Sequence, residues 1–144
     1  MKVEPIQIVL DTNVLVSAFL SRAGSAYKLV SLIGKTDFDL NLSVALAFEY
    51  ESVLKRPEQK LFLSYEEIDK LVAFFCSVSN LHDIHYLWRP TLPDPNDDFL
   101  LELALESQAE YIVTFNTRDF LIAGGRFLKV VTPVEFLRKL EYLR

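Results

Sequence analysis

The stretch from residue 93 to residue 120 constrains the fold most, because it joins a cluster of acidic residues, a helix and a strand in one unit. It opens with the sequence PDPNDD and continues with apolar residues at helical spacing. A short β-rich run, EYIVT, follows and leads into a polar turn. Carboxylate and amide side chains therefore stand at both ends of this unit. Carboxylates gathered in one place repel one another unless they keep protons or bind a cation.

Short apolar runs alternate with helical patterns along the whole chain. The runs that we expect to form strands are residues 6–10, 38–42, 84–88, 111–114 and 128–131, and helices are expected at residues 14–20, 26–33, 44–55, 65–78, 95–107 and 133–143. This alternation predicts an α/β fold, a three-layer α/β/α sandwich with a mostly parallel sheet of about five strands. The length suits one core, so we expect residues 1–144 to form a single domain.

Capping residues mark the starts of three of these helices. Ser64 with Glu67 three residues later is typical of a capping box, and Thr132 with Glu135 is a second one. Ser43 suits the N-cap of the third predicted helix. These residues fix helix starts independently of the apolar pattern.

Charge and cysteine content narrow the functional classes. The formal net charge of −5 argues against non-specific nucleic-acid binding, which depends on Lys and Arg neutralising phosphates. The lone Cys76 leaves no internal disulfide to form and no paired metal-type cysteines, so we expect a reducing, cytoplasmic setting. The N-terminal segment is too short and interrupted for a signal peptide, and no run reaches the roughly 20 apolar residues of a membrane span.

Polar residues follow the first and the fourth predicted strands. Asp11 comes directly after the run at 6–10, and Thr114 and Asn116 lie at the end of the run at 111–114. Ligands of parallel α/β sheets bind beyond the carboxyl ends of the strands, so these residues fall where the fold places active sites. The structural alternative for Asp11 is a simple helix N-cap.

Glu49 lies within an apolar stripe of the third predicted helix. Its neighbours on that face are Leu46, Tyr50, Val53 and Leu54. A buried carboxylate is costly unless it is paired, hydrogen-bonded or bound to metal. The alternatives to a functional role are a buried ion pair and a place at the exposed edge of the stripe.

The acidic cluster before the fifth predicted helix has two interpretations. Aspartates in a first helical turn are favoured by the helix dipole, and Asp94 before Pro95 is a good N-cap. Three carboxylates exceed what capping requires, so we expect at least one to serve a metal or active site, with Asp97 favoured and Asp98 pointing away. Asp119, in the turn after the fourth strand, could serve the site or cap a short helix.

All the candidate ligands offer oxygen atoms. They are Asp11, Glu49 and Asp97, with help from Asp94 or Asn116. Such a set suits Mg²⁺ or Mn²⁺ and not zinc. One or two of these ions can activate water and clamp a phosphodiester, so that bound cations, and not the net charge, meet the phosphate. Candidates to contact the substrate backbone near the same loops are Arg22, Arg118 and Arg126.

Four segments of the chain carry a family resemblance. They are VLDTNVLVSAF near the start, LSVALAFEYESVL in the middle, DPNDDFLLELALESQAEYIVTFNTRDF toward the end and TPVEFL near the C-terminus. Together, and in this order, they resemble the PIN-domain nucleases, in particular the VapC-like toxin components of bacterial type II toxin–antitoxin pairs. The resemblance covers almost the whole chain and implies a parallel sheet with acidic residues gathered at one end around Mg²⁺ or Mn²⁺.

The resemblance also implies a function and partners. The expected activity is endoribonuclease, in which a metal-activated water hydrolyses RNA phosphodiester bonds. The family further implies homodimers and an antitoxin protein that inserts a segment into the site. By position, the implied catalytic residues are Asp11, Glu49 and Asp97, with Asp94 as a supporting ligand. The supporting positions are Thr12, Asn13, Asp98, Thr114 and Asp119.

One departure from the family pattern leaves alternatives open. Many members carry Asp where this chain has Asn116, and a neutral amide would bind a second cation more weakly. This motivates a second hypothesis, a non-catalytic PIN-like module that binds RNA or a protein partner. A third is a phosphatase or receiver-type domain with Asp11 as a phosphorylated nucleophile, although a haloacid-dehalogenase-type site would want Asp where this chain has Asn13.

Overall fold

The computed structural model of the chain describes residues 4–35, 37–84, 95–120 and 128–143, and for residues 95–98, 119, 142 and 143 it describes the backbone only. Within these residues the strands are β1 (Ile6–Leu10), β2 (Phe38–Ser43), β3 (Asn80–His82), β4 (Tyr111–Val113) and β5 (Lys129–Val131). They form one sheet in the order β3-β2-β1-β4-β5, and every neighbouring pair is parallel. The predicted α/β class with a parallel, five-stranded sheet is confirmed.

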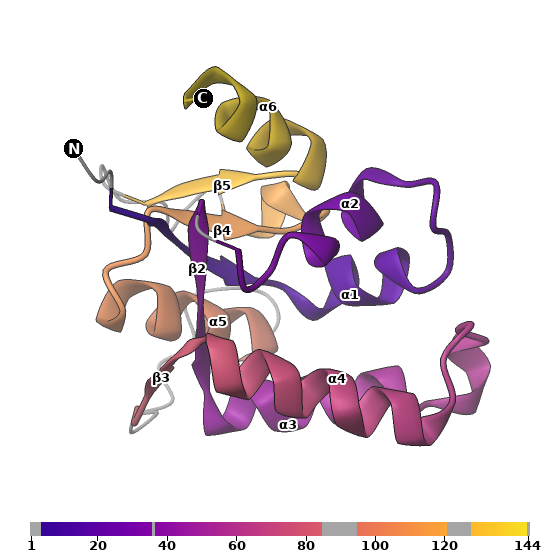
Figure 1. Ribbon diagram of the computed structural model, residues 1–144. Coiled ribbons are helices and arrows are strands. Elements are labelled where there is room, and N and C mark those ends of the chain that lie inside the picture. Colours follow the sequence, from indigo (N-terminus) through magenta and orange to yellow (C-terminus); the bar gives the residue numbers. More distant parts are fainter. Residues whose placement is uncertain (1–3, 36, 85–94, 121–127, 144) are drawn as a thin grey trace.

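Helices cover both faces of this sheet. In the described parts of the chain they are α1 (Thr12–Ala18), α2 (Ser25–Ser31), α3 (Val44–Leu54), α4 (Tyr65–Val78), α5 (Pro95–Glu106) and α6 (Pro133–Leu143), with the 3₁₀ turns η1 (Pro57–Gln59) and η2 (Thr117–Phe120). α5 packs on β1, β2 and β4, whereas α6 lies on the other side of the sheet (Figure 1). α3 and α4 pack side by side (Figure 1). None of the described helices combines the length and the apolar character needed to cross a bilayer.

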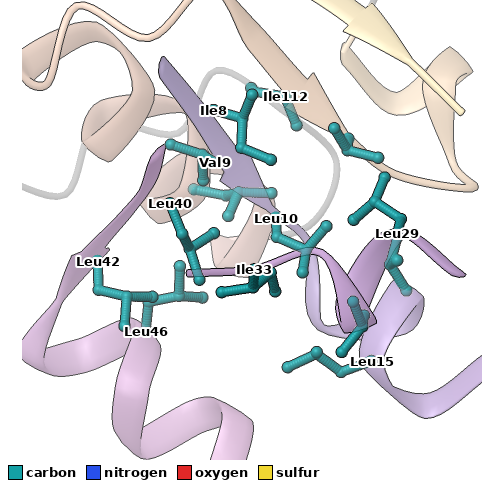
Figure 2. Packing of buried hydrophobic residues seen from close by; sticks show 14 of the residues in the cluster. Ile8, Val9, Leu10, Leu15, Leu29, Ile33, Leu40, Leu42, Leu46 and Ile112 are labelled. Carbon is teal, nitrogen blue, oxygen red and sulfur yellow. The ribbon is translucent and has the colours of Figure 1, made fainter. Parts of the chain in front are cut away.

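The core is organised around the central strand β1. Ile8, Val9 and Leu10 are completely buried, because β1 has strands on both sides and helices on both faces. Figure 2 shows these side chains in one buried cluster with Leu15 of α1 and Leu29 of α2. Burial on both faces explains why this run is continuously apolar and does not alternate.

The C-terminal helix α6 completes the core on one face. Its buried Phe136 packs edge-to-face on Phe38 of β2, with ring centroids 5.3 Å apart. It packs in the same way on Tyr111 of β4, at 5.5 Å. One ring of α6 thereby joins two strands that lie on opposite sides of β1.

The three predicted helix caps are present. Ser43 accepts a hydrogen bond from a backbone N–H in the first turn of α3, at 3.1 Å. Ser64 and Glu67 exchange both bonds of a capping box, at 3.1 and 2.9 Å. Thr132 and Glu135 do the same at 3.3 and 3.0 Å. In the two capping boxes, the hydrogen bond from the backbone N–H of Ser64 or Thr132 lowers the pKa of the Glu67 or Glu135 carboxyl.

The third strand lies earlier in the chain than its apolar pattern predicted. β3 is a three-residue strand that ends at His82, whereas the prediction was residues 84–88. Of those, Ile84 lies outside any strand and residues 85–88 fall outside the described parts of the chain. The other predicted boundaries differ from the observed ones by at most two residues. The three-residue run NLH has one apolar residue and no apolar pattern that predicts a strand. Other contacts therefore fix the position of β3.

Hydrogen bonds of polar side chains on β1, β2 and β3 supply those contacts. Asn41 is buried and donates to the side-chain oxygen of Gln7 at 3.0 Å and to the backbone oxygen of Ile8 at 3.2 Å. His82 Nε2 bonds to Asn41 Oδ1 at 2.8 Å, and Asn80 donates to Gln7 Oε1 at 2.9 Å. These bonds satisfy a buried amide and hold the edge strand β3 against β2.

Candidate active site

The strand order creates a switch point at the carboxyl ends of β1 and β4. The chain passes from β1 to β2 and β3 on one side of the sheet and places β4 and β5 on the other, so the order reverses between β1 and β4. Ligands of open α/β sheets bind at such a point. Asp11 directly follows β1 and Thr114 directly follows β4, which brings both residues to this position.

The Asp11 side chain turns toward Thr114 and not toward its own helix. Asp11 is the N-cap residue of α1, but within the described chain its carboxylate makes no capping bond. Thr114 Oγ1 instead donates to Asp11 Oδ2 at 2.7 Å. The Asp11 backbone N–H donates to Val113 O at 2.9 Å and extends the sheet by one more bond. Simple capping therefore does not explain where this carboxylate lies.

Thr114 is the centre of a small hydrogen-bond network. Besides donating to Asp11, its buried hydroxyl accepts from Asn13 Nδ2 at 3.3 Å and from the Asn116 backbone N–H at 3.0 Å. A hydroxyl has one proton and two lone pairs, so these bonds use its full capacity. Asn13 Oδ1 also accepts from the Phe115 backbone N–H at 3.4 Å. The start of α1 and the turn after β4 are thereby tied together around Asp11.

Glu49 reaches the same place from α3. Thr12, which is buried at the start of α1, donates a short hydrogen bond from its hydroxyl to Glu49 Oε2. Glu49 is half-buried beside the buried Leu46 and Tyr50 of its own helix. A carboxylate in this apolar stripe is thus bonded to the residue that follows Asp11 in the chain.

Tyr50 is a site residue that the sequence analysis did not single out. It is completely buried, and its hydroxyl donates to the backbone oxygen of Leu10, the residue before Asp11. Burial, followed by the negative charges of Asp11 and Glu49, raises the pKa of Tyr50 well above its ordinary value. Glu49 lies near Asp11 because it is bonded to Thr12, the next residue in the chain. The available signal was a hydroxyl next to Glu49 in an otherwise apolar stripe.

We expect Tyr50→Phe to remove one source of alkaline instability. The folded protein keeps the Tyr50 proton at pH values where an unfolded chain, with a tyrosine pKa of about 10, loses it. The free energy of unfolding of the wild type therefore falls as the pH rises above about 10, and the variant lacks this contribution. Urea denaturation between about pH 8 and pH 11 measures both slopes. Parallel pH curves for the two proteins would contradict the assignment.

The remaining acidic candidates are described only in part. Asp97 and Asp98 lie in the first turn of α5 and Asp119 lies in η2, but their side chains are outside the described structure. Asp94 lies outside the described residues altogether. Within the side chains that are described, no group of three or more Asp, Glu, His or Cys residues is placed to hold a metal ion. The described part of the site thus contributes two carboxylates.

The three candidate arginines differ in position. The guanidinium of Arg22 stacks over the ring of Phe62, 4.4 Å from its centroid, and Phe62 in turn packs on Phe19. Arg118 is exposed on η2, in the turn that follows β4 and Asn116. Arg126 falls outside the described residues. Arg22 therefore belongs to an aromatic cluster beyond α1, whereas Arg118 belongs to the turn beside the site.

A parallel sheet with helices on both faces and acidic side chains at its switch point places the chain in the class of doubly wound α/β domains. The sequence comparison identifies the family within this class. Residues 7–118 match the PIN domain family, and the chain belongs to it. The match spans the segment from β1 into η2 and so includes Asp11, Glu49 and Thr114. Membership indicates a nuclease-type function.

A curated relative comes from Methanocaldococcus jannaschii. The chain is 28% identical over 144 aligned residues to the uncharacterized protein MJ1680 of that organism, and the alignment covers 94% of this chain and 92% of the relative. The likeness therefore covers most of the length of both proteins. It adds no activity to the one that the family indicates.

The described donors fit the cation on which PIN domains generally depend. Asp11 and Glu49 offer carboxylate oxygens, and the hydroxyls of Thr12 and Thr114 hold them in place. Hard oxygen ligands are the ones that Mg²⁺ and Mn²⁺ prefer. The chemistry of the residues is thus compatible with a divalent cation at the switch point.

We expect Thr114→Val to weaken the site without changing the side-chain volume much. The variant loses the donor to Asp11 and the acceptor for Asn13, and groups that orient a ligand typically contribute about 10- to 100-fold to metal affinity or activity. Thr114→Ser keeps the hydroxyl and is the matched control. Titration with Mn²⁺ should show weaker binding for the Val variant and near wild-type binding for Ser. Equal binding by both would show that the hydroxyl has no such role.

Proposed function

We propose that the protein is a metal-dependent endoribonuclease that hydrolyses RNA phosphodiester bonds. The observation that carries this proposal is the arrangement of two carboxylates, from two different parts of the chain, at the sheet's switch point: Asp11 accepts from Thr114, and Glu49 accepts from Thr12, the residue that follows Asp11. A nuclease of the PIN family needs acidic oxygens at this point, and the chain belongs to that family.

The proposed roles follow from the contacts. Asp11 and Glu49 would hold Mg²⁺ or Mn²⁺, and Asp97, Asp94 and Asn116 are the proposed additional ligands. When bound, one or two such ions supply an activated water and stabilise the attacking and leaving oxygens of the phosphodiester. The further supporting residues are Thr12, Asn13, Asp98, Thr114 and Asp119.

Two hydroxyls position the carboxylates before any substrate arrives. Thr114 donates to Asp11, and Thr12 donates to Glu49. The phenol of Tyr50 fixes the peptide that precedes Asp11. The carboxylates therefore need little rearrangement to act, and this preorganisation is what a hydrolytic site requires.

Cleavage of an end-labelled RNA pool tests the proposal. We expect products in Mg²⁺ or Mn²⁺ and none in EDTA. The new 5′ ends should carry phosphate, because water and not the ribose 2′-hydroxyl attacks. Metal-independent cleavage, or 2′,3′-cyclic phosphate products, would contradict the mechanism.

Asn116 favours a second candidate function, a non-catalytic module that binds RNA or a protein. Its side chain is a neutral, exposed amide where many family members carry Asp, and its backbone N–H is bonded to Thr114. Calorimetric titration with Mn²⁺ separates the two candidates. Absent metal binding together with absent cleavage favours the module, and tight binding that needs Asp11 favours the enzyme.

The biological setting is proposed from the family resemblance. We infer a cytoplasmic toxin that forms a homodimer and is inhibited by an antitoxin protein. Two measurements bear on this proposal: sedimentation for the dimer, and growth arrest on expression that a protein encoded beside the gene relieves. Normal growth on expression of the active enzyme would favour a housekeeping nuclease.

A further inference from the structure

The turn after β4 carries an exposed aromatic ring beside the candidate site. Phe115 is 44% exposed, and within the described chain it belongs neither to the buried core nor to the partly buried side chains packed against it. It directly follows Thr114, whose hydroxyl holds the Asp11 carboxylate. A large apolar side chain is thus presented to solvent next to the polar network.

Two other exposed aromatic rings of the described chain, Phe62 and Phe74, have packing partners. Phe62 packs on Phe19, with ring centroids 5.8 Å apart, and carries the Arg22 guanidinium on its face. Phe74 is 47% exposed but lies 6.2 Å from the ring of Phe75. Both rings contribute to local packing, so their exposure has a structural explanation. Phe48 and Tyr65 are also exposed, on α3 and α4. Phe115 differs from these rings because it lies in the turn that is bonded to the network around Asp11.

The backbone that carries the ring is fixed to the site. The Phe115 N–H donates to Asn13 Oδ1 at 3.4 Å, and the next N–H, from Asn116, donates to Thr114 Oγ1 at 3.0 Å. The Thr114 hydroxyl in turn donates to the Asp11 carboxylate, and the Asn13 amide nitrogen donates to the same hydroxyl. The backbone that carries the ring is therefore held in place relative to the Asp11 carboxylate.

We propose that Phe115 is a stacking platform for one base of a single-stranded RNA, next to the phosphodiester held at Asp11. This inference rests on the proposed nuclease function. Aromatic side chains bind bases of any sequence by stacking. A base in a duplex is already stacked on its neighbours, so the platform selects unpaired RNA.

The charge of the chain favours such a platform. With a net charge of −5, the protein gains little affinity from neutralising phosphates, the usual source of nucleic-acid binding. Stacking adds affinity that does not depend on net charge and that high salt does not screen. The exposed Arg118, on the same turn, supplies at most one phosphate contact of its own.

Steady-state cleavage of a short single-stranded RNA tests the platform with matched variants. We expect KM to rise about 5- to 150-fold for Phe115→Ala and for Phe115→Leu, which keeps apolar bulk but has no ring face. Phe115→Trp should retain a wild-type KM, and kcat should change little in all three. Phe74→Ala, at a ring of similar exposure on α4, should leave KM unchanged. A wild-type KM for Phe115→Ala, or failure of Trp to rescue, would overturn the proposal.

A series of RNAs with one base removed at successive positions locates the contact. For the wild type, removal of the base at one position should raise KM by the same factor as Phe115→Ala does on the intact RNA. With the RNA that lacks this base, Phe115→Ala should have the same KM as the wild type. If the KM factors for base removal and for Phe115→Ala multiply at every position, the stacking contact is overturned. RNA cleavage that needs Asp11 but is indifferent to Phe115 would refute the platform and leave the nuclease intact. Absence of any RNA binding and cleavage by the wild type would refute both.

Discussion

Replacing Asp11 by Asn is expected to reduce RNA cleavage by more than about 100-fold, since groups that merely orient a metal ligand already contribute about 10- to 100-fold. The fold should survive the change. Asn retains an oxygen that can accept from Thr114, and the backbone bond from Asp11 to Val113 does not involve the side chain. Cleavage of a labelled RNA in Mn²⁺ gives the rate, and circular dichroism checks the fold.

Thermal unfolding sharpens this prediction. Asp11→Asn removes one of two neighbouring negative charges, so without metal its Tm should equal or exceed that of the wild type. Mn²⁺ should raise the Tm of the wild type by binding the folded state, and this rise should be lost in the variant. Asp39→Asn is the matched control, because Asp39 lies on β2 and accepts from Gln7 at 3.0 Å. Full cleavage by Asp11→Asn would remove the catalytic assignment.

Phe136→Ala is expected to lower the free energy of unfolding by about 3–5 kcal/mol, the usual loss for a buried phenylalanine. Phe136 is completely buried and bridges Phe38 and Tyr111, so its removal opens a cavity between α6 and two strands. For a chain of this length the loss corresponds to a fall in Tm of about 10 °C or more. Calorimetry and urea denaturation both measure it.

The Phe136 variant also tests whether the chain is one cooperative unit. α6 lies outside residues 7–118, which match the PIN domain family, yet it packs on the same sheet. Val134→Ala, at an exposed position of α6, is the control and should change stability by no more than about 0.5 kcal/mol. Equally small effects of both substitutions would mean that α6 is dispensable, against the prediction of a single domain.

Much of the fold could be predicted because local signals were strong and consistent. The strand β1 is apolar at four of its five positions and ends at Leu10 as expected, and the capping box at Ser64 fixes the start of α4. The strand β3 could not be predicted in this way. Its position depends on bonds from Asn80 and His82 to residues far away in the chain, and no local periodicity records such pairings.

Local signals likewise predicted some residues of the candidate site and not others. Position after a strand was enough to nominate Asp11 and Thr114, and a charge within an apolar stripe was enough to nominate Glu49. The involvement of Tyr50 had no comparable signal, because a buried tyrosine in a helix is ordinary until its hydroxyl is seen to bond to Leu10. Whether Asp97 shares the site stays a prediction, since its side chain is outside the described structure.

Local patterns were sufficient to predict the α/β class, the strand that precedes Asp11 and the residue types suited to a hard cation, because these follow from periodicity, capping and ligand chemistry. The bonds from Thr114 to Asp11 and from Thr12 to Glu49 became known only from the folded chain. Those partners are 103 and 37 residues apart in the chain. They meet because parallel strands must place their carboxyl ends at one edge of the sheet, and the strand order, which no local pattern encodes, selects which ends are neighbours.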